Sequence, residues 1–66
     1  MCLSTVYVGQ EPQPIAKNVT SVTMREGKLV LRDIMGVTTE VDAEIESVDL
    51  MENRIFLRRR EWTPQR

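Results

Sequence analysis

Short runs of alternating apolar and polar residues follow one another along the chain. The first run, residues 2–8, is rich in β-branched and aromatic residues and stops at Gly9. Val6 and Val8 fall on one side of this strand, and a period of two places Cys2 on the same side. Further strands are expected over residues 18–25, 28–34, 38–46 and 54–60. Because no apolar stripe with a helical period competes, the pattern predicts an all-β fold.

Turn residues separate these strands. Residues 9–14 contain two prolines within three positions and are expected to form an extended loop. Gly27 and Asn53 tolerate the left-handed backbone of tight turns, and each follows a glutamate at the end of a β pattern. Val48 and Leu50 have the opposite parity to the preceding strand, which predicts a bulge or bend near Ser47.

The number and spacing of the strands predict a small antiparallel β-barrel or rolled sheet of five to six short strands. All 66 residues belong to a single small β domain, in which residues 58–66 are expected to form an irregular tail. A core of this size is marginally stable and usually needs a disulfide, a metal or a partner subunit. One cysteine excludes an internal disulfide, so a metal or a partner is expected.

The composition narrows the class of function. A lone thiol suits a reducing compartment, and no apolar run reaches the roughly 18 residues of a membrane span, so a cytoplasmic protein is expected. Nine basic and ten acidic residues give a net charge of −1, which argues against nucleic acid as a partner. The chain has no histidine and therefore none of the usual nucleophile–histidine arrangements, which argues against an enzyme.

Cys2 is the residue with the most specific chemistry. If Met1 is removed, the terminal amine, the Cys2 thiolate and the backbone nitrogen of Leu3 lie within one chelating span. Such N/S donors favour a square-planar metal, either Ni(II) or Cu(II). The alternative is that Cys2 is a small buried apolar residue at the start of the first strand.

Three other groups of residues have candidate chemistry. Four acids on one strand face (Glu40, Asp42, Glu44, Glu46) could attract Ca²⁺, but they would form a straight ridge, which favours a solvated face. The thioethers of Met24, Met35 and Met51 are expected to fill the core rather than to bind copper. A basic run beside a stacking ring offers an alternative function, an RNA-binding module built from Arg58, Arg59, Arg60 and Trp62.

Several segments together carry a resemblance to a known family. They are Met1-Cys2, Val6-Tyr7-Val8, residues 18–22, residues 27–31, residues 33–36, residues 45–50 and residues 54–57. In these features the chain resembles the CooT family of small nickel-binding accessory proteins of carbon monoxide dehydrogenase. The resemblance implies a homodimer that holds one Ni(II) between the Cys2 residues of two subunits, with backbone nitrogen of Cys2 or Leu3 as further ligands. It also implies a metallochaperone that supplies a nickel enzyme.

Overall fold

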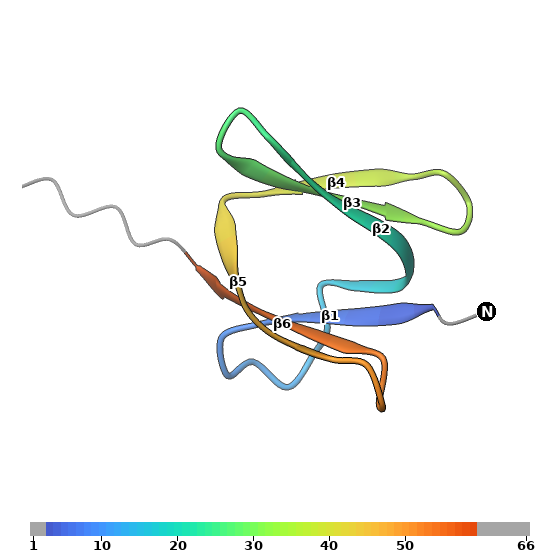
Figure 1. Ribbon diagram of the computed structural model, residues 1–66, viewed down its shortest axis with the longest axis vertical. Helices are drawn as coiled ribbons and strands as arrows, with labels where there is room; N and C mark the ends of the chain where they lie inside the picture. The colour runs from blue at the N-terminus through green and yellow to red at the C-terminus, as the bar shows by residue number, and fades with distance from the viewer. Residues whose placement is uncertain (1–2, 60–66) are drawn as a thin grey trace, which may run out of the picture.

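The computed structural model describes residues 3–59, which fold into six β-strands without a helix (Figure 1). The strands are β1 Ser4–Val8, β2 Ala16–Arg25, β3 Lys28–Asp33, β4 Thr38–Val41, β5 Ala43–Asp49 and β6 Arg54–Arg59. The all-β prediction is therefore confirmed. Over this part of the chain there is accordingly no helix of the length and apolarity that crossing a membrane requires. Arg58 and Arg59 are the last residues of β6, in agreement with the strand expected over residues 54–60, and the rest of the expected tail lies outside the described residues.

All six strands belong to one sheet, in the order β4-β3-β2-β1-β6-β5. Four of the five neighbouring pairs are antiparallel, but β1 and β6 run parallel, with Val6 opposite Ile55 and Val8 opposite Leu57. The sheet is thus mixed rather than wholly antiparallel. A parallel pair needs a long connection between its strands, and here β2 to β5 supply it.

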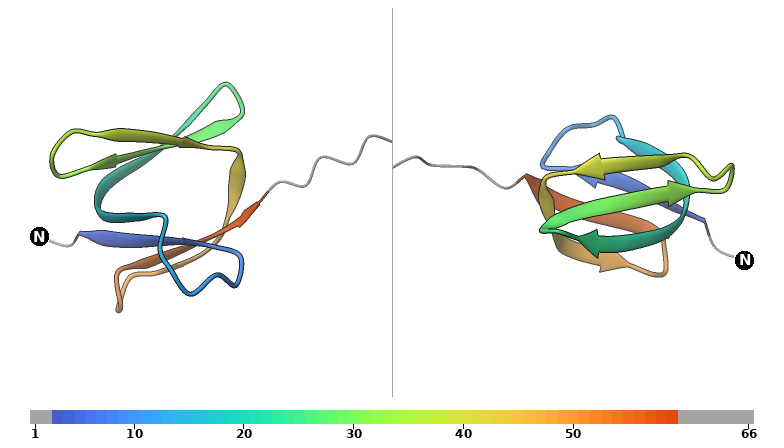
Figure 2. Two further views of the ribbon diagram at one scale, coloured as in Figure 1. Left: turned by 180° about the vertical axis from the view of Figure 1, so that it is seen from behind. Right: turned by 90° about the horizontal axis from the view of Figure 1, so that it is seen from above.

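The two edge strands, β4 and β5, are consecutive in sequence and only Asp42 separates them. A connection this short requires the sheet to curl until its edges approach at this corner, as Figure 2 shows. The strand expected over residues 38–46 is therefore broken at Asp42. The sheet stays open, because its two edge strands are not paired with each other. Of the two predicted architectures, the rolled sheet therefore describes the fold better than the closed barrel.

The core lies inside the curl and consists of aliphatic side chains. The buried residues are Val6, Val8, Val19, Leu29, Leu31, Ala43, Ile55 and Leu57. Along β1, β3 and β6 they alternate with more exposed residues, as the period of two predicts. No polar or charged side chain among residues 3–59 is buried with them.

The turns follow the sequence signals closely. Glu26 and Gly27 have φ angles of 51° and 81°, the two left-handed residues of the tight turns that suit hairpins. Asn53, with a φ of 59°, occupies the left-handed region between β5 and β6. The register between β5 and β6 shifts between Ile45 and Ser47, which confirms the irregularity expected near Ser47.

Candidate functional site

Three separate segments meet at the end of the sheet where β1 begins. The amide of Thr5 donates a hydrogen bond to the carbonyl oxygen of Asn53 at 2.9 Å, which places the β5–β6 turn beside the start of β1. Ser4 pairs with Val19 of β2, and the amide of Ile34 donates to the carbonyl of Asn18 at 2.9 Å. The β3–β4 turn therefore lies at the same end, on the right of Figure 1. We call this region the amino-terminal end: residues 3–5, 34–37 and 50–53.

Both turns at the amino-terminal end carry exposed apolar side chains. Five of the eight large apolar residues that are exposed within residues 3–59 belong to them: Ile34, Met35, Val37, Leu50 and Met51. Met35 and Met51 are 82% and 92% exposed. A group of exposed apolar side chains on a small protein marks a surface for contact with another molecule.

The prediction that the methionines fill the core is wrong. Met24 is 57% exposed, and Met35 and Met51 are more exposed still. The reason is their position: Met35 and Met51 occur in turns, and Met24 lies next to the end of β2. The interior of the curl is filled by aliphatic residues from the strands.

An aspartate fixes the backbone of each apolar turn. Oδ1 of Asp33 accepts hydrogen bonds from the amides of Met35 and Val37, both at 2.9 Å. Oδ1 of Asp49 accepts bonds from the amides of Met51 and Glu52 at 3.0 and 3.1 Å. Such side chain-to-backbone bonds hold a turn in one conformation. The apolar side chains are thus exposed on turns whose shape is already set.

Of the predicted metal ligands, the structure describes only Leu3, which belongs to the amino-terminal end. Leu3, half-buried, immediately precedes β1. Cys2 lies outside the described residues, one residue before Leu3 in sequence. From residue 3 to residue 59, no three histidine, cysteine or carboxylate side chains gather closely enough to hold a metal ion.

Comparison with known proteins identifies the family. The family model of CooT, the CO dehydrogenase accessory protein, matches residues 1–58. The chain belongs to the CooT family. A crystal structure assigned to CooT from Carboxydothermus hydrogenoformans superposes with a TM-score of 0.82, covering 91% of this chain and 100% of that chain at 24% identity. That likeness confirms the fold. No curated protein matches the chain.

Membership of the CooT family settles the broad role of the protein. It is an accessory protein of CO dehydrogenase and not itself a catalytic enzyme. The argument from composition against an enzyme is therefore confirmed. The family match extends over Met1 and Cys2 as well as over all six strands up to Arg58.

The four acids of this CooT-family protein do not form the straight ridge that alternation predicts. Glu40 lies on β4, Asp42 lies at the bend, and Glu44 and Glu46 lie on β5. The break at Asp42 places the acids on the two opposite edge strands. A carboxylate oxygen of Glu44 is 3.5 Å from Nη2 of Arg58.

The basic segment proposed for RNA binding is only partly described. Arg58 and Arg59 are exposed on β6, whereas Arg60 and Trp62 lie outside the described residues. The ion pair with Glu44 offsets the charge of Arg58. Within residues 3–59, no contact favours the RNA-binding alternative.

One aromatic contact has no counterpart in the sequence pattern. Tyr7 of β1 and Phe56 of β6 stack with their ring centroids 5.5 Å apart and their planes at 19°. The two residues are paired in the parallel register. Because Tyr7 and Phe56 are far apart in sequence, this contact can be recognised only when β1 and β6 are known to be neighbours. It stabilises the parallel pairing on which the location of the amino-terminal end depends.

Proposed function

We propose that this CooT-family protein binds Ni(II) through Cys2 at the interface of a homodimer and supplies the metal for maturation of CO dehydrogenase. The observation that carries the proposal is the pair of exposed apolar turns, each hydrogen-bonded to an aspartate, at the end of the sheet where β1 begins. Only Leu3 separates Cys2 from β1, so covalent geometry keeps the thiol within about 10 Å of that end.

The donor atoms of two chains fit a nickel site. Each chain supplies the thiolate of Cys2 and a nitrogen, from the terminal amine or from the backbone of Cys2 or Leu3. Two thiolates and two nitrogens complete the square plane that Ni(II) accepts, and no histidine is required. With one thiolate and one nitrogen from each chain, the square plane is complete only when a second copy is present.

The apolar turns offer the surface that brings two chains together. The β5–β6 turn lies beside the start of β1, and the β3–β4 turn lies at the same end of the sheet beyond β2, so a twofold contact through both turns would also bring the two amino termini together. Burial of the methionine and leucine side chains would stabilise a fold whose core, within residues 3–59, has eight buried residues. We therefore assign the amino-terminal end as the homodimer interface.

The test is a native mass spectrum of the protein titrated with Ni(II). We expect one nickel per two chains in the wild-type protein, together with a thiolate-to-nickel absorption band. Cys2→Ser should remain a folded dimer without tight nickel binding or the band. A metal-free monomer at micromolar nickel, or a Cys2→Ser variant with full affinity, would refute the proposal.

A matched variant distinguishes chelation from the presence of a thiol. Cys2→Ser combined with Ser4→Cys keeps one cysteine per chain but separates it from the terminal amine by two residues. The amine and thiol then no longer form a small chelate ring, and we expect nickel affinity to stay low. Recovery of wild-type affinity in this variant would show that the position next to the terminus is irrelevant.

A further inference from the structure

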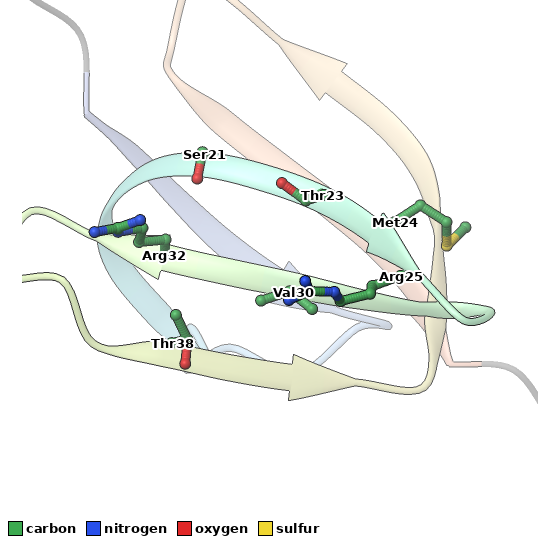
Figure 3. A pocket seen from close by; sticks show the side chains of 7 residues that line it. All are labelled: Ser21, Thr23, Met24, Arg25, Val30, Arg32 and Thr38. Carbon is green, nitrogen blue, oxygen red and sulfur yellow. The ribbon is translucent and has the colours of Figure 1, made fainter.

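A hollow of about 300 Å³ lies on the outer face of β2, β3 and β4, the face turned away from the core (Figure 3). Its lining residues are Ser21, Thr23, Met24, Arg25, Val30, Arg32 and Thr38. Val30 is the apolar residue at its centre, and Figure 3 shows the Arg25 side chain turned back along β3 beside it. The volume is at the lower end of the range for small-molecule sites.

The cross-strand register concentrates positive charge around this hollow. Arg25 is paired directly with Lys28, and Arg32 stands between Ser21 and Thr38 in one row across three strands. Like charges directly opposite each other destabilise a sheet. Among residues 3–59, the side chains of these three cations form no ion pair with a carboxylate. An anion bound between them would relieve their repulsion.

Hydroxyl groups complete the set of donors. Ser21, Thr23 and Thr38 line the hollow, and within the described part of the chain their hydroxyls form no hydrogen bond to protein. Glu40 lies opposite Val30 on the same face, and Glu26 lies in the β2–β3 turn between Arg25 and Lys28. Among the described residues, no carboxylate lines the hollow itself, whereas two arginines and three free hydroxyls do, so its lining is suited to a multiply charged anion.

We propose that this hollow binds a phosphate-bearing small molecule of about the size of a mononucleotide. The planar guanidinium groups of Arg25 and Arg32 can each donate two parallel hydrogen bonds to phosphate oxygens. The hydroxyls can donate to the remaining oxygens, and Val30 offers apolar contact to the rest of the ligand. Leu3, the one proposed nickel ligand that the structure describes, does not line the hollow, and the phosphate proposal does not rest on the nickel proposal.

The test is a titration followed by backbone amide NMR at 0.15 M ionic strength, with inorganic phosphate and adenosine monophosphate as separate probes. We expect saturable shifts at the amides of Ser21, Thr23, Val30, Arg32 and Thr38. Tighter binding of the nucleotide would identify a phosphorylated organic ligand, whereas equal binding would identify the phosphate group itself as the ligand.

Two single substitutions test whether the ligand binds in the hollow itself. Arg32→Gln should weaken binding at least about tenfold, since a hydrogen bond to a charged group contributes about 1.5–3 kcal/mol. Lys17→Gln, which removes an exposed cation of β2 that lies outside the hollow, should change the affinity less than about twofold.

Three results would overturn the proposal. The first is the absence of saturable shifts up to about 10 mM of either probe. The second is an equal loss of affinity in Arg32→Gln and Lys17→Gln, which would indicate general charge attraction. The third is much tighter binding of a single-stranded oligonucleotide, with shifts spread beyond the hollow, which would indicate a nucleic-acid surface.

Discussion

Replacement of Met51 by aspartate tests the role of the amino-terminal end most directly. Met51 is 92% exposed and lies at the tip of the β5–β6 turn, so the substitution leaves the core of the single chain untouched. The same side chain is buried in the proposed dimer. The change should therefore weaken association without unfolding the chain, and the amide CD spectrum should stay as in the wild type.

The size of the effect follows from the exposed side chain. Full burial of a methionine side chain contributes about 1.5–3 kcal/mol. A twofold dimer buries Met51 twice, so the substitution removes roughly 3–6 kcal/mol of association free energy. This corresponds to a dimer dissociation constant raised roughly 100-fold to 10,000-fold. Burial of a new carboxylate adds to the effect in the same direction.

Sedimentation equilibrium of the metal-free and nickel-loaded protein measures this constant. Met24→Asp is the matched control, because Met24 is also exposed but lies beside the β2–β3 turn, away from the amino-terminal end. It should dimerise as the wild type does. A Met51→Asp protein with the dissociation constant of the control would show that the amino-terminal end is not the interface.

Two further predictions concern the metal and the turn. Nickel affinity should fall at least about 100-fold per dimer from pH 7.5 to 6.5, because two Cys2 thiols with a reference pKa of ~8.5 must each lose a proton. A nickel titration that shows equal affinity at both pH values would contradict thiolate ligation. Asp49→Ala removes the acceptor of two hydrogen bonds from turn amides and should lower the free energy of unfolding, measured in urea, by about 1–2 kcal/mol. Asp49→Asn keeps an acceptor oxygen and should recover most of this loss. An equal loss in both variants would show that the hydrogen bonds contribute nothing to stability.

Local features of the fold could be predicted from the sequence because they depend on neighbours in the chain. The tight turn at Glu26 and Gly27 needs residues that accept positive φ, and the change of parity after Ile45 requires an extra residue in the strand. Leu29 and Leu31, and likewise Ile55 and Leu57, share a face by the period of two and are buried. The candidate ligand Cys2 was found in the same way, since chelation by a terminus depends only on adjacent atoms.

The pairing of strands and the exposure of individual side chains could not be predicted in this way. A period of two shows which residues share a face of a strand, but it does not show which strand lies beside it. The parallel register of β1 and β6, the Tyr7–Phe56 contact and the bend at Asp42 all depend on partners far apart in sequence. The exposure of Met35 and Met51 was missed for a related reason: an apolar residue is buried only if another element covers it, and none among the described strands does.

The sequence by itself therefore determined the strands and most of the turns, and it identified Cys2 as the candidate metal ligand, because each of these depends on residues close together in the chain. Only the tertiary structure placed the two apolar turns at the same end of the sheet as the start of β1, and the arginines and hydroxyls around one hollow. Both arrangements depend on the strand order, which is set by the burial of the whole core and not by any one segment.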